Sequence, residues 1–242
     1  MIKIENTEVV GWEHAIRGMR NPKNSWDKSD SCIDFGGIPY GLEYRDSIPG
    51  SLIIGNNDIS LMQKLCKAGT DHRKFMRMIV VYADITAPLY WWKEFDTYKV
   101  GTVANSCSTM HKIHEKEFTL DDFSTDHLEG FSWDRLDDLI IHLNIYREKF
   151  VNASQKFNES DEQFKERKKS YWWQMIQLLP SSYNQRRTVM LNYEVLANMY
   201  KPTSRRYHKQ DEWNVNCKDS LCSWIEKLPH SELITGKEVE NE

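Results

Sequence analysis

The segment Thr97–Met110, TYKVGTVANSCSTM, combines hydroxyl, amide and thiol side chains that could line a ligand pocket. Such groups donate and accept hydrogen bonds without adding net charge. Cys107 adds a thiol, which is a good nucleophile when a nearby cation lowers its pKa. Two simpler interpretations stay open: the run is the polar tail of the aromatic helix that precedes it, and Cys107 is a small packing residue between serines.

Other reactive side chains form weaker patterns. His72 and Arg73 follow the end of a predicted helix, where they either contact a ligand or compensate the helix dipole. His111 and His114 are three residues apart, but only Glu115 could join them, so we expect no metal site. The five cysteines include no CxxC pair, which favours reduced thiols over a zinc site or a disulfide framework.

The composition is that of an ordinary globular protein. The chain has 242 residues, of which 28% are charged, and its net charge of -4 gives no basic field that would indicate nucleic acid binding. The N-terminus lacks the apolar region of a signal peptide, and no run approaches the roughly 18 apolar residues that span a bilayer. We therefore expect a cytoplasmic protein without membrane contact. We predict a single domain over residues 1–235 and a flexible tail over residues 236–242.

Periodicity and helix signals predict the elements that would position these side chains. In the loop Arg20–Ser31, several cations and Trp26 indicate either a lid or partner surface, or an ordinary loop. Asp58 is expected to cap the helix that follows this region. The predicted order in the first third is a strand at Ile2–Val10, a helix at Trp12–Met19, the loop, a helix at Asn56–Gly69 and a strand at Phe75–Ile85.

Helices are predicted for most of the remaining chain. Thr86 and Pro88 occupy the cap and first-turn positions of a helix that would place Trp91, Phe95 and Tyr98 on one stripe. Two long helices follow, one with an apolar face at Leu136, Leu139, Ile140, Leu143 and Phe150, the other with an apolar face at Phe164, Tyr171, Met175 and Leu178. Ser160 and Gln163 have capping-box spacing at the start of the second helix. Later helices are predicted at Asn192–Tyr200 and at Gln210–Leu228, and Pro229 ends the last one.

The segment from Ile85 resembles the signature region of the flavin-dependent thymidylate synthases. In that family an apolar strand, an Ala-Pro pair and a helix lead into the motif RHRxxSxNExSxRY. The motif lies without gaps on Thr97–Met110 of this chain. Lys99 retains a cation, and Thr102 retains a hydroxyl, where the family has Arg and Ser.

Two further stretches carry the resemblance, in the family's order. Leu178–Leu196 is similar to the segment that holds an Asn contacting the flavin, which corresponds to Asn192. His208–Asn214, HKQDEWN, is similar to the family's HAQWEIR pattern, with Asn214 in place of an Arg that binds the nucleotide phosphate. The resemblance covers residues 61–233.

This resemblance implies an α/β fold with a central mixed sheet flanked by helices, long C-terminal helices, and a homotetramer with sites between subunits. In the family, FAD reduced by NADPH transfers a methylene group from methylenetetrahydrofolate to dUMP, and the protein supplies orientation and charge. The implied cofactor contacts are His72, Arg73, Tyr98, Lys99, Asn105 and Asn192, and the substrate contacts are Glu94, Thr102, Cys107, Ser108, Arg186, Arg187 and Asn214.

The departures from the family concern phosphate binding. Thr97, Thr109, Ile176 and Asn214 stand where the family has arginines, and none of them can neutralise a phosphate. If dUMP binds, other cations must take over, and the candidates are Arg17, Arg20, Arg73, Arg186 and Arg187. The pair Arg186–Arg187 could equally be solvated.

Three hypotheses follow. The chain is a divergent FAD-dependent enzyme that modifies a pyrimidine nucleotide or a related base. Alternatively, it is a non-catalytic nucleotide-binding or protein-interaction module. Between these lies a site for an uncharged ligand such as a nucleoside.

Overall fold

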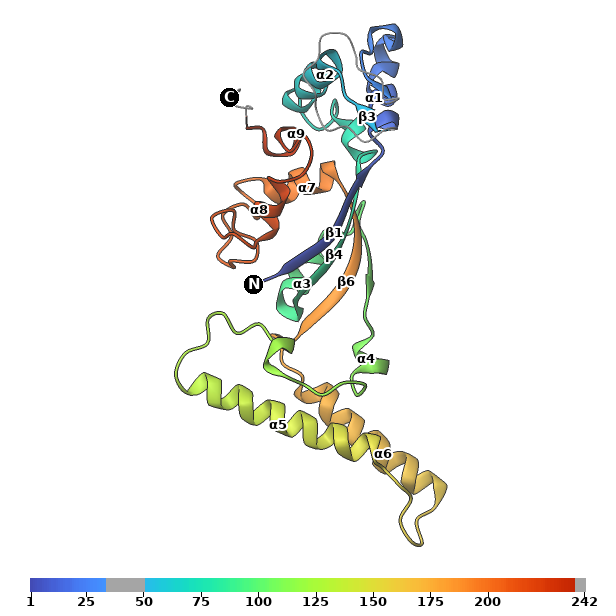
Figure 1. The fold of residues 1–242 in the computed structure, drawn as a ribbon, viewed down its shortest axis with the longest axis vertical. Coiled ribbons are helices and arrows are strands. Elements are labelled where there is room, and N and C mark those ends of the chain that lie inside the picture. The colour runs from blue at the N-terminus through green and yellow to red at the C-terminus, as the bar shows by residue number, and fades with distance from the viewer. Residues whose placement is uncertain (34–50, 238–242) are drawn as a thin grey trace. The chain divides into compact units, whose positions relative to one another are not determined.

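The computed structural model describes residues 1–33 and 51–237 and contains a central four-stranded sheet (Figure 1). In β4, Val81, Ala83 and Ile85 are buried at every second position, which is the alternation expected of a strand with one face in a core. The strands lie in the order β1 (Lys3–Val10), β4 (Val80–Pro88), β6 (Asn184–Asn192) and β5 (Val103–Ser106).

The described residues form two compact units, and the chain passes between them several times. Unit 1 contains residues 1–5, 84–97 and 104–188, and unit 2 contains the described parts of 6–83, 98–103 and 189–242. The predicted single domain over residues 1–235 stays a prediction. Of the predicted tail, residues 238–242 lie outside the described part of the chain.

In unit 1, two long helices pack against each other: α5 (Phe131–Val151) and α6 (Asp161–Leu178). The predicted helices and capping box are confirmed, but Leu178, predicted on the apolar face of α6, is exposed. Ser160 accepts a hydrogen bond from the Gln163 amide, and the Gln163 side chain accepts one from the Ser160 amide. The core of this region consists of Ile113, Phe118, Phe123, Leu136, Leu143 and Met175, with Leu139, Ile140 and Phe150 partly buried against it.

A short aromatic helix, α3 (Leu89–Phe95), follows β4 directly and adds buried aromatic rings to unit 1. Trp91, Trp92 and Phe95 are buried, and the rings of Trp91 and Phe95 stack with centroids 5.1 Å apart. The first two amides of this helix donate to backbone carbonyls of Tyr183 and Ser181, so they are satisfied without a side-chain cap. The other elements of unit 1 are α4 (Thr109–Lys112) and the 3-10 turn η4 (Leu120–Asp122).

Unit 2 is organised around α7 (Tyr193–Tyr200), in which seven of the eight residues are buried. Tyr193 packs edge-on against Trp12 at 5.2 Å, and its amide donates to the Ile79 carbonyl. The other elements are α1 (Trp12–Arg20), α2 (Asn56–Lys67), α8 (Leu221–Ile225), α9 (Glu232–Thr235), the antiparallel pair β2 (Cys32–Ile33) and β3 (Leu52–Ile53), and the 3-10 turns η1 (Asn21–Lys23), η2 (Trp26–Lys28) and η3 (Lys74–Arg77).

Several predicted boundaries are wrong. The helix predicted from Thr86 begins at Leu89, because β4 continues through Pro88 before the chain turns. The strand predicted from Phe75 begins at Val80, after η3. Of the helix predicted at Gln210–Leu228, only α8 is helical.

The N-cap of α2 is Gly55 rather than the predicted Asp58. Asp58 is instead fully buried and pairs with Arg20. The predicted loop after α1 contains the two turns η1 and η2.

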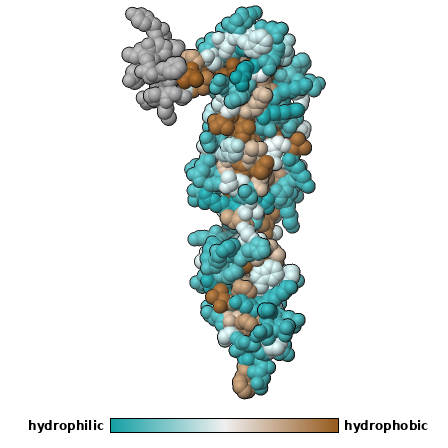
Figure 2. All heavy atoms as spheres, turned by 90° about the vertical axis from the view of Figure 1, so that its right-hand side faces the viewer, coloured by the Kyte–Doolittle hydropathy of each residue, from teal (hydrophilic) through white to brown (hydrophobic). Residues whose placement is uncertain are grey.

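The face of the molecule seen in Figure 2 is mainly hydrophilic, with separate hydrophobic patches. None of the helices in residues 1–33 and 51–237 is long and apolar enough to cross a membrane. Within the same residues there is no group of His, Cys, Asp and Glu side chains that could hold a metal ion.

Candidate functional site

The unit 1 part of the candidate segment is an exposed strand and turn held by β6. All four residues of β5 are exposed, Asn105 among them. The Cys107 amide donates to the Arg186 carbonyl (3.0 Å), and the Cys107 carbonyl accepts from Gln185 Nε2 (3.0 Å). The Ser108 hydroxyl accepts from the His111 amide and caps α4. The backbone is thus fixed while the Cys107 thiol remains exposed.

Arg187 is fixed by three neighbours within unit 1. Its guanidinium carbon lies 4.2 Å from the ring centroid of Trp92. Nη1 donates to Asp96 Oδ1 (2.9 Å), and Nε donates to Gln185 Oε1 (3.0 Å). Because Gln185 also binds the Cys107 carbonyl, Arg187 supports the candidate segment through this amide.

Arg186 is paired less tightly. Its Nη2 donates to Asp84 Oδ2 (2.8 Å), and Glu5 lies at the edge of ion-pair distance at 3.9 Å. The hydrogen bond from Arg186 to Asp84, together with the charge of Asp84, raises the pKa of Arg186. Half of the Arg186 side chain remains exposed, so it is the more available of the two arginines. The predicted substrate contact Glu94 is half-buried, and its carbonyl accepts from the Thr97 hydroxyl (2.7 Å).

In unit 2, Tyr98 belongs to an aromatic cluster. Its hydroxyl lies 2.8 Å from the Ser204 hydroxyl, and its ring centroid lies 6.4 Å from that of Trp213. The guanidinium carbon of Arg205 lies 5.7 Å from the Tyr98 ring and 5.5 Å from the Trp213 ring. Tyr98 is therefore occupied by intramolecular contacts.

Gly101 and Asn192 lie against each other where β6 ends, and Thr102 follows Gly101 in the chain. Gly101 has a φ of +78°, and a Cβ at this position would lie 2.6 Å from Asn192 Nδ2, so only glycine fits here. Asn192 Oδ1 accepts from the Val195 amide (3.0 Å) and caps α7. Thr102 Oγ1 is buried and has no hydrogen-bond partner within the described part of the chain. A ligand group reaching this hydroxyl would satisfy it.

Arg73 forms a buried ion pair inside unit 2. Its Nε lies 2.9 Å from Glu194 Oε2, and its Nη2 donates to Glu194 Oε1 (3.1 Å). The charge of Arg73 is thereby compensated within the protein. His72, next to it, is exposed.

Asn214 is also satisfied internally. Its Nδ2 donates to the His208 carbonyl (2.9 Å), and its Oδ1 accepts from the Asn216 amide (3.0 Å). Lys99 is exposed, and it has no ion-pair partner among residues 1–33 and 51–237.

The structure thus brings Cys107, Arg186 and Arg187 together in unit 1, and in unit 2 it places Gly101, the neighbour of Thr102, against Asn192. Sequence reasoning missed the residues that hold them. Gln185, Asp96 and Glu194 carry no motif, and Glu194 lies 121 positions from the arginine that it pairs with.

Neither a protein-family model nor a curated protein matches the chain. Two solved structures of thymidylate synthase X from Helicobacter pylori with FAD and dUMP do match. One has a TM-score of 0.56 and 12% identity, and the match covers 97% of each chain. The other has a TM-score of 0.58 and 13% identity, with 96% of this chain and 97% of that chain covered.

The UMP/dUMP methylase PolB from Streptomyces cacaoi, bound with 5-Br dUMP, matches with a TM-score of 0.50, 11% identity, and coverage of 98% of this chain and 94% of that chain. The chain has the fold of the flavin-dependent thymidylate synthases. The fold-level resemblance to this family and the predicted α/β class, a sheet flanked by helices, are therefore confirmed. At these identities the match concerns the fold alone.

The side chains of this thymidylate synthase-like fold do not suit FAD as they are arranged within each unit. The diphosphate of FAD needs compensating cations, but Arg73 is compensated by Glu194. Tyr98 and Asn192 are occupied by other contacts. Of the predicted FAD contacts in the described residues, Lys99 alone is a cation without an ion-pair partner.

Proposed function

We propose that this protein binds a pyrimidine nucleoside or nucleotide at the segment Thr97–Met110. The observation that carries this proposal is the fold, matched over 96–98% of the chain by three structures determined with dUMP or 5-Br dUMP. Thr102 Oγ1, buried without a partner in the described residues, supports a ligand that offers a hydrogen-bonding group.

The paired arginines favour a nucleoside over a nucleotide. A phosphate would have to compete with Asp84 for Arg186, and with Asp96 and the Trp92 ring for Arg187. Breaking such contacts costs free energy that the phosphate must offset. The phosphate of dUMP is therefore expected to add little to affinity.

A second candidate is enzymatic: FAD-dependent methyl or methylene transfer to a pyrimidine nucleotide with an altered substrate. It is favoured by the matched structures that hold FAD together with dUMP. NADPH and methylenetetrahydrofolate are expected as co-substrates only if that reaction is retained. Against this candidate, Arg73, one of the predicted FAD contacts, already has its charge compensated by Glu194.

The segment is expected to be completed by another subunit of a homotetramer. All of β5 is exposed, and so are Lys99, Cys107 and Ser108. A ligand site normally buries most of a small ligand, which such an exposed strand does not do alone. Light scattering should give the mass of a tetramer; a monomer at micromolar concentration would refute this part.

The binding proposal is tested by isothermal titration calorimetry with deoxyuridine, dUMP and FAD. We expect deoxyuridine and dUMP to bind with affinities within about threefold of each other, because Arg186 and Arg187 are already paired with Asp84 and Asp96. The absorbance spectrum of the purified protein tests the second candidate: a flavin band would support it. If neither pyrimidine releases or absorbs heat at millimolar concentration, the binding proposal is wrong.

Matched variants locate the site. Asn105 and Ser106 are neighbours on β5 and their side chains point to opposite faces of the strand. Asn105→Ala is expected to weaken deoxyuridine binding about fivefold, since one hydrogen bond is lost. Ser106→Ala is the control and should leave the affinity unchanged; equal losses in both variants would contradict a site on one face.

A further inference from the structure

The outer strand β5 leaves one edge of the central sheet open. The strand order β1, β4, β6, β5 makes β1 and β5 the two edges of this sheet. The Cys107 amide donates to the Arg186 carbonyl of β6, so Cys107 directs its backbone groups toward β6. Backbone groups alternate in direction along a strand, so Asn105 also faces β6. Ala104 and Ser106 therefore direct their amides and carbonyls outward, where a further strand can pair with them.

The opposite edge, β1, is protected against such pairing. It carries the charged side chains of Lys3, Glu5 and Glu8, and Asn6 interrupts the regular backbone with a φ of +52°. Charged side chains and local kinks are devices by which proteins prevent an edge strand from pairing with another chain. The strand β5 has neither, because Val103–Ser106 contains no charged residue and no residue with a positive φ.

Apolar side chains flank the open edge in the sequence and are also exposed. All four residues of β5 are exposed, and Val103 among them is 59% exposed. Val100, just before the strand, is 90% exposed, and Met110, just after it, is 44% exposed. Covering such side chains with a protein partner removes apolar surface from water, which stabilises the contact. Open backbone groups and exposed apolar side chains together favour a protein strand as the occupant of this edge.

The lack of charge on β5 favours a second copy of this chain as that partner. In an antiparallel pair of identical strands about a two-fold axis, like side chains lie close to one another, so charged ones would repel. With the axis at Asn105, Ala104 lies opposite Ser106 of the partner subunit, and Val103 lies opposite Cys107 of the partner subunit. This register uses the whole of β5, and it sets no Asp, Glu, Lys or Arg side chain against another.

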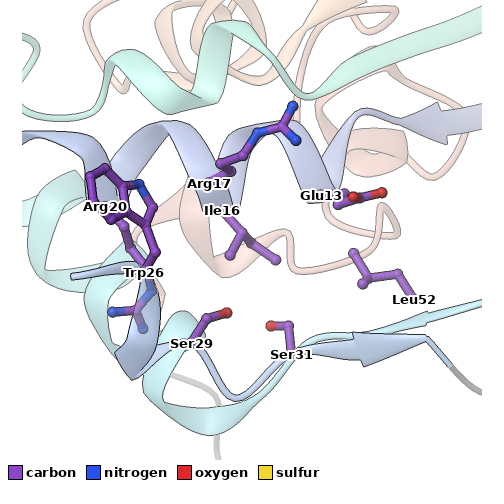
Figure 3. A pocket seen from close by; sticks show the side chains of 8 residues that line it. All are labelled: Glu13, Ile16, Arg17, Arg20, Trp26, Ser29, Ser31 and Leu52. Atoms are coloured by element: carbon purple, nitrogen blue, oxygen red, sulfur yellow. The ribbon is translucent and has the colours of Figure 1, made fainter. Parts of the chain in front are cut away.

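The cavity of unit 2 is less suited to a second copy. It has a volume of about 210 Å³ and is lined by residues of α1 together with Ser29 and Ser31 (Figure 3). Both serine hydroxyls donate to the buried carboxylate of Asp58, at 2.7 and 2.6 Å, so their protons are not available to a partner. The lining also includes Glu13 and Arg17, and a partner that covered them would have to remove charges from water.

We propose that β5 pairs antiparallel with β5 of a second copy, with Asn105 at the two-fold axis. The pairing joins two four-stranded sheets into one continuous sheet. The outward backbone groups of Ala104 and Ser106 then exchange hydrogen bonds across the axis. Asn105 lies beside the partner subunit's Asn105, so the candidate ligand segments of two subunits adjoin. This inference rests on the assembly expected under the proposed function and names the surface that forms it.

Disulfide cross-linking of the full chain tests the register. Asn105 and its copy form a non-hydrogen-bonded pair, whose Cα atoms lie about 4.5 Å apart, a distance that a disulfide spans. In a Cys107→Ser background, Asn105→Cys should give a covalent dimer on mild oxidation, seen on a non-reducing gel. Ala104→Cys is the matched control, because Ala104 lies about 9 Å from its own copy, beyond the roughly 7 Å that a disulfide allows. Equal cross-linking of both variants, or none above the Cys107→Ser parent, would overturn the proposal.

A proline substitution tests the pairing itself. Ser106→Pro removes an outward amide but no bond to β6, and an edge strand tolerates proline at such a position. Light scattering should give half the mass of the wild type at the same concentration, whereas Ser106→Ala, which keeps the amide, should give the wild-type mass. Circular dichroism checks that each variant is folded. An unchanged mass for Ser106→Pro would mean that another surface joins the copies, and the proposal would be wrong. Pyrimidine binding is measured separately by calorimetry, so either idea can fail without the other.

Discussion

Removing the charge of Asp58 is expected to destabilise unit 2 strongly. Asp58 is fully buried and accepts hydrogen bonds from Arg20, Ser29 and Ser31, and Arg20 is itself 4% exposed. Asp58→Asn keeps the volume but leaves the Arg20 charge buried without its counter-ion. Breaking a buried pair in this way costs about 3–5 kcal/mol. Since domains are stable by about 5–15 kcal/mol, this is a large part of the total.

Urea unfolding monitored by circular dichroism measures this loss. Replacing both partners, with Asp58→Leu and Arg20→Met, should recover much of it, because no uncompensated charge then remains. The exposed pair Arg135–Asp138 provides the control: Asp138→Asn should change the midpoint little. A loss under about 1 kcal/mol for Asp58→Asn would refute the reasoning.

The carboxylate of Asp58 also makes the folding stability of the protein depend on pH. The pKa of Asp58 lies below its unfolded value of 3.8, so its contribution to stability is complete above that pH. As the pH falls from 3.8 through the folded pKa, the unfolded chain takes up the proton first and the contribution is lost. Asp58→Asn should therefore flatten the acid side of the stability curve.

Three further outcomes are expected. Gly101→Ala should lower stability more than Gly69→Ala, by about 1–3 kcal/mol, because both have positive φ but only the first Cβ meets a neighbour; equal losses would exclude the clash. At pH 8, iodoacetamide should label the exposed Cys107 far faster than Cys222, whose pKa burial raises to about 12. Mass spectrometry measures the two labelling rates, and faster labelling of Cys222 would contradict the prediction. The hydrogen bond from Arg167 lowers the pKa of Glu159 to about 2, so Glu159 should stay ionised at pH 3.5 in an NMR titration.

The helices of unit 1 were predictable because their signals are local. The capping box of Ser160 and Gln163, and the apolar spacing from Leu136 to Leu143, act within one helix. The error at Gln210–Leu228 has a tertiary origin. Trp213 is buried in the cluster with Tyr98 and Arg205, and this packing takes precedence over the helical pattern.

The candidate segment was predictable only in part. The resemblance predicted the family's fold, which the solved structures share, while the position of the site within that fold stays a prediction. The contacts of its arginines were not predictable, because an ion pair such as Arg73 with Glu194 joins residues far apart in the chain and leaves no periodic trace. Whether an arginine is available to a phosphate depends on such partners.

The packing of α7 links ligand binding to folding. Asn192 caps the helix, Glu194 in its first turn pairs with Arg73, and seven of the eight helical residues are buried. A compound that holds Asn192 and Thr102 in place would also hold the first turn of this helix. It would bind the native state alone and raise the melting temperature in proportion to the logarithm of its concentration. Thermal melting can therefore rank candidate compounds before any reaction is known.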